Sequence, residues 1–554
     1  MGSEGLDAVK ILEKYLANRV AAIEKLDDGK VVIEVGKDDI TDVVNVVVNE
    51  LGGIYTIIIG NDARIIDNSI HNIYVFSLDS LKTYLLIRVR LDSEKPEVNS
   101  ITPIVKGANW GEREVRDLLN INILNHPDPR RLILPDGWPK DINPLKKDFS
   151  HTIRPKLYGS ERYIPSRSED VVAISYGPYH PALHEPEYFE LHINGETVVD
   201  VEYRGFHVHR GIEKLGESRL SYNQIPFVAE RICGICGFVH SACYCQAVEN
   251  AAKIEVPERA HYLRSLILEI ERLHSHLLWL GIACHVLGFD TGFMHAWRIR
   301  EPIMDLAEAL TGNRKNYGLN IVGGVRRDIN KDSIEKVLKM LDSFKKEYNK
   351  FINGLTSVRE IVKRLEGSGL LPKSEAISYG VVGPVARASG LKRDVRVDHP
   401  YAAYKEVSFK VPTYSECDNM SRLMVRIDEV YESIEIINQL LDKMPGGPIF
   451  AENAEVPEYR EGFSGIEAPR GEDVHYVLTG KYSKVYRWRV RAPSYNNIPA
   501  LKVMLHECPL SDAPLTIASI DPCFSCTDRL LVVDVRSGKK FKVSLKTLAR
   551  GWKP

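Results

Sequence analysis

Two short stretches, Arg231-Ile-Cys-Gly-Ile-Cys-Gly237 and Asp521-Pro-Cys-Phe-Ser-Cys-Thr-Asp-Arg529, constrain the fold most strongly. Each contains a Cys-x-x-Cys pair, and four thiolates form a soft donor set that suits zinc, iron or nickel. A zinc ribbon has its second pair about twenty residues after the first, whereas roughly three hundred residues separate these pairs. The predicted metal site therefore forms only after a large domain has folded. From the cysteines alone, a structural zinc ion, a disulfide or buried thiols remain alternatives.

Composition indicates a globular chain and names no partner. The 554 residues are 44% hydrophobic, which suffices for about three or four domains. The 73 lysines and arginines nearly balance the 75 aspartates and glutamates, so charge gives no argument for nucleic acid. The nine cysteines fit metal binding in a reducing compartment better than a disulfide framework. We expect no secretory signal, and the longest uncharged apolar run, 276–289, is shorter than the about 20 residues that span a bilayer.

The first part of the chain is predicted to be an α+β domain over residues 1–138. An amphipathic helix is expected near Leu6–Ile23. Four strands are predicted to follow, at Lys30–Val35, Gly53–Ile59, Ile73–Ser77 and Thr83–Val89. Residues 139–170 contain several prolines and are predicted to form a linker.

Residues 171–529 are predicted to form a mainly α-helical domain with small β elements. Long amphipathic helices are expected at Pro257–Leu280, Ser333–Leu365 and Asp418–Lys443. Short strands are expected near Val171–Ser175, Phe189–Asn194 and Val198–Tyr203. The apolar runs of the tail, 530–554, flank a turn sequence and predict a β-hairpin.

The residues around the cysteine pairs resemble a known enzyme family. Asp-Pro-Cys-x-x-Cys near the C-terminus, with Arg-Ile-Cys-Gly-x-Cys far upstream, is similar to the large subunit of nickel-iron hydrogenases. In the first domain, Trp110-Gly-Glu-Arg-Glu114 and His126-Pro-Asp-Pro-Arg-Arg131 resemble the 30-kDa subunit of respiratory complex I, and the second domain then resembles the 49-kDa subunit. The combination resembles the membrane-bound, complex-I-related hydrogenases, most closely the large subunits of formate hydrogenlyases.

This resemblance implies a nickel-iron centre whose iron carries carbon monoxide and cyanide. Cys233 and Cys523 would be terminal ligands of nickel, and Cys236 and Cys526 would bridge nickel and iron. Cleavage of dihydrogen needs a metal, a base that takes the proton and an exit path for electrons. Because a terminal thiolate remains basic, Cys523 is predicted to take the proton.

Further family motifs predict the surroundings of the metals. Arg470 in Ile466-Glu-Ala-Pro-Arg-Gly471 is expected above the open metal positions as a donor to cyanide. Pro493 and Ser494 are expected beside the other cyanide, which the Ser494 hydroxyl would bond. The resemblance places a proton relay at Glu185, with Glu187 as the alternative.

Two more positions concern a second cation and processing. Glu213 matches a position that, in many members, binds a second cation, here magnesium or iron. Those members end the cysteine motif with histidine, whereas this chain has Arg529, which weakens the match. In the family a maturation protease cuts after this position once nickel is installed, and because the chain continues from Leu530 to Pro554, it is expected to be the precursor.

The predicted function is reversible reduction of protons to dihydrogen, with electrons from formate or carbon monoxide oxidation. No cysteine motif is left for an iron-sulfur cluster, so we expect an iron-sulfur small subunit and ferredoxin-like subunits to deliver electrons. Complex-I-like membrane subunits would hold the chain peripherally at the cytoplasmic face of the membrane. One alternative is a non-hydrogenase coupling subunit of complex I type, which lacks the cysteine pairs. The other is a zinc-stabilised interaction module, which would not need Glu185 or Arg470.

Overall fold

The computed structural model describes most of the chain. It covers residues 4–16, 19–27, 29–150, 152–153, 155–156, 158, 171–178, 185–206, 209–452 and 455–524, together with the backbone of 532–533 and 540–541. Two predicted site residues, Cys526 and Arg529, lie outside this part, as does most of the predicted tail. Within the tail, β16 (Val532–Val533) pairs antiparallel with β17 (Lys540–Phe541).

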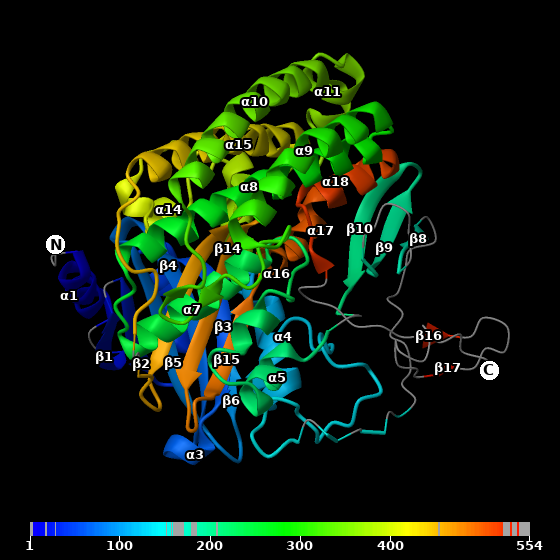
Figure 1. The fold of residues 1–554 in the computed structure, drawn as a ribbon. Helices are drawn as coiled ribbons and strands as arrows, with labels where there is room; N and C mark the ends of the chain where they lie inside the picture. The colour runs from blue at the N-terminus through cyan, green and yellow to red at the C-terminus, as the bar shows by residue number, and fades with distance from the viewer. Residues whose placement is uncertain are drawn as a thin grey trace.

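A mixed five-stranded sheet forms the first part of the molecule (Figure 1). Its strands run in the order β1-β2-β5-β4-β3, and β2 and β5 are parallel whereas the other neighbours are antiparallel. Their bounds are β1 (Val20–Asp27), β2 (Lys30–Val35), β3 (Ile54–Asp62), β4 (Ser69–Leu78) and β5 (Thr83–Asp92). Because strand side chains alternate between faces, Ile73 and Val75 of β4 lie on one face and Tyr74 and Phe76 on the other. Both faces are apolar and both are covered.

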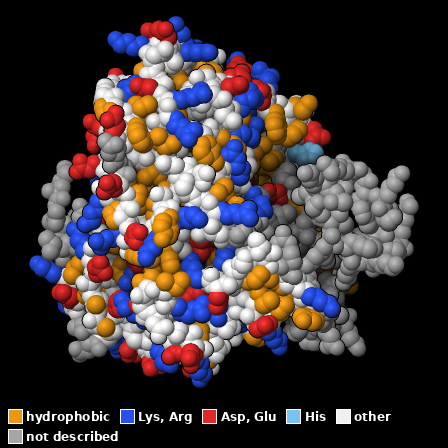
Figure 2. Space-filling view, turned by 60° about the horizontal axis from the view of Figure 1, so that its bottom comes forward, with side chains coloured by type: hydrophobic (Ala, Val, Ile, Leu, Met, Phe, Trp, Pro, Cys, Tyr) orange, Lys and Arg blue, Asp and Glu red, His pale blue; other side chains and the backbone are white. Residues whose placement is uncertain are grey.

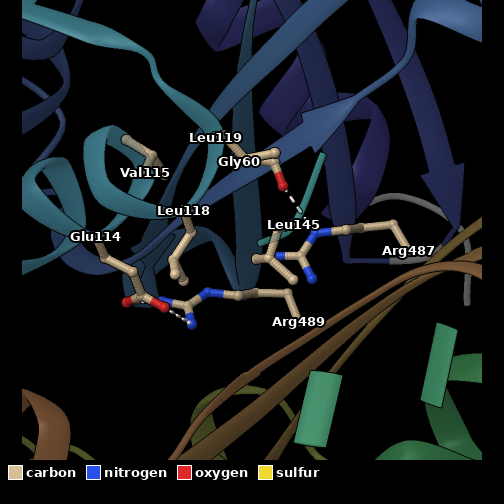
Figure 3. Close-up of a pocket in the computed structure, with 8 residues that line it drawn as sticks. All are labelled: Gly60, Glu114, Val115, Leu118, Leu119, Leu145, Arg487 and Arg489. Carbon is tan, nitrogen blue, oxygen red and sulfur yellow. Dashed lines mark hydrogen bonds and ion pairs between the residues drawn. The ribbon is translucent and has the colours of Figure 1, made fainter. Parts of the chain in front are cut away.

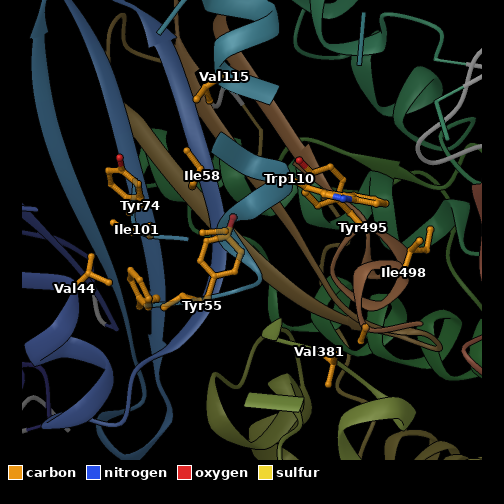
Figure 4. Packing of buried hydrophobic residues seen from close by; sticks show 14 of the residues in the cluster. Val44, Tyr55, Ile58, Tyr74, Ile101, Trp110, Val115, Val381, Tyr495 and Ile498 are labelled. Atoms are coloured by element: carbon orange, nitrogen blue, oxygen red, sulfur yellow. The ribbon is translucent and has the colours of Figure 1, made fainter. Parts of the chain in front are cut away.

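Helices cover one face and a second sheet covers the other. Ile73 and Val75 pack with Phe463 and Val474 of a three-stranded antiparallel sheet, β13 (Glu461–Ala468), β14 (Gly471–Thr479) and β15 (Val485–Arg491). The helices of the opposite face are α1 (Glu4–Leu16), α2 (Ile40–Asn49) and α4 (Ala108–Leu119). Figure 4 shows how the apolar cluster of that face continues from Tyr55 through Trp110 to Tyr495. The two halves of the chain therefore share one hydrophobic core.

Long helices build the second part: α7 (Gly237–Ala252), α8 (Glu258–Val286), α9 (Asp290–Thr311), α10 (Lys331–Thr356) and α15 (Asn419–Asp442). Of these, α8, α9, α10 and α15 lie above the sheets in Figure 1, whereas α7 packs against β13 and β14. The short helix α11 (Arg359–Leu365) follows α10. The shorter helices are α3 (Arg64–Asp67), α5 (Ile212–Arg219), α6 (Ile225–Ala229), α12 (Lys373–Tyr379), α13 (Pro384–Ala388), α14 (Val395–Asp398), α16 (Pro493–Asn497), α17 (Leu501–Met504) and α18 (Ala513–Ser519). The remaining strands are β6 (Glu97–Asn99), β7 (Asn122–Leu124), β8 (Val172–Tyr176), β9 (Tyr188–Asn194), β10 (Thr197–Arg204), β11 (Asn320–Ile321) and β12 (Gly324–Val325).

The predicted fold class, an α+β part followed by a mainly helical part with small sheets, is confirmed. Two predicted helices were too long. The first ends at Leu16, because Val20–Asp27 pairs with β2 as a strand, and sheet pairing outweighs the weak helical preference of that segment. The helix predicted over Ser333–Leu365 is interrupted between α10 and α11. The sheet β13–β15 was not predicted.

Three arginines cap the edge strand β3 of the first sheet. They alternate along β15, so their side chains leave the same face. Each donates from Nε to a main-chain carbonyl of β3: Arg487 to Gly60 (2.8 Å), Arg489 to Ile58 (3.3 Å) and Arg491 to Thr56 (3.1 Å). Figure 3 shows Arg487 reaching Gly60 and Arg489 reaching Glu114 beside a small cavity. We call these three residues the arginine ladder.

The Trp110-Gly-Glu-Arg-Glu114 motif has a structural role in this arrangement. Glu114 accepts hydrogen bonds from both terminal nitrogens of Arg489, at 2.7 and 2.8 Å, and from the Tyr495 hydroxyl. Glu112 accepts bonds from the Ser100 and Thr102 hydroxyls and the Ile101 N–H. Glu112 therefore fixes a loop of the first domain. Glu114 docks that domain onto β15.

The surface agrees with the balanced composition. Figure 2 shows lysine and arginine side chains interspersed with aspartate and glutamate on the face in view. Among the described residues, no helix combines the length and apolar character that crossing a bilayer requires.

Candidate metal centre

The fold brings three of the four predicted cysteine ligands together. Cys233 and Cys236 lie in the loop that leads into α7, and Cys236 immediately precedes the first turn of that helix. Cys523 follows α18, and its Sγ lies 3.2 Å from the Sγ of Cys233, although 290 residues separate them in sequence. All three side chains are buried. The fourth predicted ligand, Cys526, lies outside the described residues.

The thiols fit a metal group. Two thiolates 3.2 Å apart can share one soft ion at a metal–sulfur distance of about 2.3 Å. The Cys233 sulfur also accepts the main-chain N–H of Cys236 at 3.4 Å. A hydrogen bond with Cys233, and then burial, hold the pKa of the Cys236 thiol well above its usual range. Because a coordinated thiol is deprotonated outright, a bound cation would stabilise thiolates that the apolar surroundings alone disfavour.

Arg470 is buried beside these cysteines and is held in one orientation. Its Nε donates to the Asp521 carbonyl and its Nη2 to the Asp521 carboxylate, both at 2.8 Å. Its Nη1 donates to the Ser275 hydroxyl at 3.2 Å. Burial opposes the charge, but Asp521 and the three thiols hold the pKa of Arg470 well above its usual range. The guanidinium is thus a fixed positive charge next to the sulfur atoms.

The glycine after Arg470 is required by packing. Gly471 has a φ of +126°, and a Cβ at this position would lie 2.6 Å from the main-chain nitrogen of Gly383. Gly383 in turn has a φ of +68°, and a Cβ there would lie 2.4 Å from the Arg470 carbonyl oxygen. The backbones therefore touch where side chains cannot fit, and this contact fixes the turn between β13 and β14.

Ser494 contacts the second cysteine segment. It lies in α16, which begins with Pro493, and its buried hydroxyl accepts the main-chain N–H of Cys523 at 2.9 Å. A hydroxyl that accepts one bond keeps its own proton to donate. The predicted proximity of this segment to the cysteines is therefore present in the structure.

The predicted acidic residues lie in different settings. Glu185 is half-buried in a bend before β9, and Glu187 is fully buried next to the same strand. Glu213 lies on α5, where it accepts bonds from Arg487 (2.8 Å) and Arg489 (3.1 Å). Burial opposes its ionisation, yet these arginines lower its pKa to about 2. Two guanidinium groups already balance this carboxylate, so the arrangement does not favour a second cation there.

Sequence reasoning missed the roles of several residues. Asp521 was quoted as part of the cysteine motif, but its function as the anchor of Arg470 depends on a contact across 51 residues. The buried cluster of His240, Asp473 and His475 was not predicted at all, although the histidine shortly after Cys236 was a usable signal. None of the other described cysteines forms a disulfide. Cys417 is half-buried, and the rest are buried: Cys243, Cys245, Cys284 and Cys508.

Comparison with protein families agrees with this geometry. Residues 33–154 match the model of the respiratory-chain NADH dehydrogenase 30 Kd subunit. Residues 287–461 and 449–529 match that of the 49 Kd subunit of the same enzyme. Residues 210–284, which include Cys233 and Cys236, match the nickel-dependent hydrogenase family.

Similar proteins span nearly the whole chain. Formate hydrogenlyase subunit 5 of Escherichia coli (strain K12) is 45% identical over 507 residues, which are 90% of this chain and 89% of that protein. Hydrogenase-4 component G of the same organism is 41% identical over 532 residues, 95% of this chain and 93% of that protein. Among solved structures, a chain of the membrane-bound sulfane sulfur reductase (MBS), an archaeal respiratory membrane complex, is 34% identical with a TM-score of 0.62, and the match covers 66% of this chain and 100% of that one.

The matched families and relatives define a metal-dependent oxidoreductase with a complex-I-like body. The chain belongs to the family of large, catalytic subunits of the membrane-bound, complex-I-related nickel-iron hydrogenases. The predicted function and enzyme class are confirmed by these relatives, and none of the comparisons favours the non-hydrogenase alternative.

Proposed function

We propose that the chain reversibly reduces protons to dihydrogen at a nickel-iron centre held by Cys233, Cys236, Cys523 and Cys526. The observation that carries this proposal is the 3.2 Å approach of the Cys233 and Cys523 sulfur atoms beside the anchored Arg470. When bound, the metal group, with carbon monoxide and cyanide on its iron, supplies the redox chemistry by which dihydrogen is formed or split.

The chain's own residues would position this group and move protons. Arg470 presents a fixed positive charge that stabilises negative charge at the open side of the site, in surroundings with little water. Ser494 orients the Cys523 main chain and retains a hydroxyl proton to donate to a cyanide. Cys523 would accept a proton from the substrate, and Glu185 would pass that proton on toward solvent.

The assembly around the chain follows from the same proposal. Electrons would arrive from an iron-sulfur small subunit and further ferredoxin-like subunits, fed by formate or carbon monoxide oxidation. Membrane subunits of complex I type would hold the chain peripherally on the cytoplasmic face. A maturation protease would remove residues 530–554 after Arg529. The relatedness to subunits of multisubunit respiratory complexes supports partner subunits in general.

Metal analysis of the protein purified from its native host tests the proposed centre. We expect nickel and additional iron in equal amounts per chain, and infrared bands of carbon monoxide and cyanide. Zinc without nickel, in protein that lacks the tail, would contradict the proposal. Mass spectrometry of the C-terminus, made on the same sample, identifies unprocessed precursor so that an unloaded chain is not mistaken for a zinc protein.

Replacing Arg470 with lysine is expected to leave nickel content unchanged and to lower turnover by about 10- to 100-fold. Lysine keeps the charge but lacks the planar fork that bonds Asp521 and Ser275 at once. Hydrogen evolution from a reduced dye measures the effect. Arg298→Lys, at an exposed pair with Glu347, is the matched control and should retain full turnover. Unchanged turnover in Arg470→Lys would reject the role of the guanidinium.

Replacing Glu185 with glutamine is expected to slow exchange between dihydrogen and deuterated water by about a hundredfold, because an amide cannot relay a proton. Nickel content should not change. Glu187→Gln is the matched comparison, since Glu187 is the buried carboxylate closest in sequence. Slow exchange in Glu187→Gln and normal exchange in Glu185→Gln would assign the relay to Glu187 instead.

A further inference from the structure

A second cluster of ionisable side chains lies between α7 and β14. His240 on α7 and Asp473 and His475 on β14 are each 0% exposed. The Nδ1 atom of His240 lies 3.1 Å from Oδ2 of Asp473 and 3.3 Å from Nε2 of His475. Nε2 of His475 lies 3.4 Å from Oδ2 of Asp473. The three atoms therefore form a nearly equilateral triangle, and we call these residues the histidine–aspartate cluster.

A triangle of this size has the dimensions of a metal site, but Trp488 argues against a metal. A tetrahedral ion with nitrogen and oxygen ligands at about 2.0–2.1 Å holds them about 3.3 Å apart. The Trp488 indole N–H, however, donates to Nδ1 of His475 over 3.1 Å. An indole nitrogen only donates, so Nδ1 must offer its lone pair, and a neutral imidazole then carries its proton on Nε2. The Nε2 atom of His475, which lies near His240 and Asp473, therefore carries a hydrogen and has no lone pair for a metal.

The electrostatics of the cluster centre on the Asp473 carboxylate. Burial opposes the charges of both His240 and Asp473, yet Asp473 raises the pKa of His240, and His240 and His475 lower that of Asp473. Burial also lowers the pKa of His475. One carboxylate oxygen thus lies 3.1 Å from a nitrogen of His240 and 3.4 Å from a nitrogen of His475. Removal of the carboxylate would take the negative charge away from two buried rings that face each other.

The cluster joins the two segments that carry the predicted metal site. His240 lies one helical turn beyond Cys236, and residues spaced in this way lie on the same side of a helix. Asp473 lies shortly after Arg470, at the start of β14. One turn further along α7, the Cys243 thiol donates to the Asp473 carbonyl at 3.5 Å. Both the side chain and the backbone of Asp473 therefore tie α7 to the strand that follows Arg470.

We propose that Asp473 is a positioning residue: in a metal-free cluster with His240 and His475, it fixes the first turn of α7, and with it Cys236, relative to Arg470. This inference rests on the proposed nickel-iron centre. Metal content tests that centre, whereas amide exchange and the nickel signal test the role of Asp473. Failure of the proposed centre can therefore be distinguished from failure of the positioning role.

The test compares Asp473→Asn with the wild type in the purified hydrogenase complex. Asparagine has nearly the same shape but offers no charge to the two rings. We expect the same nickel, iron and zinc content, shifted g-values of the nickel electron paramagnetic resonance signal, and turnover lower by about tenfold. Amide hydrogen exchange of residues 237–243 should become about tenfold faster.

Glu249→Gln is the matched control, because it removes another buried carboxylate from α7, one that pairs with Arg264 at 2.7 and 2.8 Å. In Glu249→Gln, the nickel signal and the amide hydrogen exchange of residues 237–243 should be the same as in the wild type. Loss of about one metal ion per chain in Asp473→Asn, but not in Glu249→Gln, would show that the cluster binds a metal and would overturn the proposal. Wild-type g-values and wild-type amide exchange in Asp473→Asn would also overturn it. Should Asp473→Asn not fold, Trp488→Phe removes the N–H that fixes the His475 tautomer, together with part of a buried ring. An unchanged nickel signal in that variant would also overturn the proposal.

Discussion

Replacement of Cys233 by serine is expected to abolish nickel incorporation and hydrogen evolution while the chain remains folded. The Cys233 sulfur lies 3.2 Å from that of Cys523 and accepts the N–H of Cys236, so this position is in contact with both cysteine segments. A serine hydroxyl is a harder donor with a much higher pKa and does not replace a thiolate on nickel. Nickel per chain, measured by elemental analysis, should fall to near zero.

The control for this experiment is Cys245→Ala. Cys245 is fully buried on α7, the helix that follows the cysteine loop, but is not part of the proposed ligand set. This variant should keep nickel and activity and lose only the packing of one sulfur atom. Circular dichroism of both variants separates unfolding from loss of metal. A Cys233→Ser chain that retained nickel and evolved dihydrogen would remove Cys233 from the site.

Replacement of Arg489 by methionine is expected to lower the free energy of unfolding by about 3–5 kcal/mol, because it breaks a buried ion pair and leaves the Glu114 carboxyl buried without its partner. Arg489 is 5% exposed at the side chain and bonds Glu114 of the first domain at 2.7 and 2.8 Å. Urea unfolding followed by tryptophan fluorescence measures the effect, since the Trp110 ring contacts the Tyr495 ring edge-on at this boundary.

Two further variants define what the Arg489 result means. Arg90→Met breaks a pair with Glu34 whose arginine is 49% exposed, so it should cost at most about 1 kcal/mol. The double variant Glu114→Gln with Arg489→Met removes both charges and should recover part of the loss. A loss below about 1 kcal/mol in Arg489→Met alone would mean that this pair does not hold the two halves together.

The proximity of the predicted ligands could be anticipated from sequence because the spacing and neighbours of the cysteines are informative. Three of these cysteines do meet, and Arg470 and Ser494 lie beside them. The long helices were predictable because their apolar residues repeat at helical spacing. The α15 start was marked as well, since Asp418 accepts the N–H of Ser421.

The sheet β13–β15 was not predictable in the same way. Its strands bury charged residues such as Arg487, Arg489 and Glu472, which a pattern of polar and apolar letters assigns to the surface. Each of them bonds a residue of the other half of the chain, hundreds of positions away: Arg487 bonds Gly60, Arg489 bonds Glu114 and Glu472 bonds Tyr84. Only the folded arrangement reveals these partners. For the same reason Glu213 resembled a cation ligand in sequence but pairs with arginines in the structure. Asp473 gains its role only because α7 lies against β14.

The arginine ladder has a consequence for how this protein can be produced and divided. An edge strand whose carbonyl groups are open can pair with strands of other molecules. Without β15, β3 would expose such an edge together with an apolar face of its sheet. Expression of the first half alone should therefore yield aggregates rather than a soluble module. Because both halves are on one polypeptide, every copy of this edge has its own β15 at high effective concentration once β15 has been synthesised, and this protects the edge from other chains.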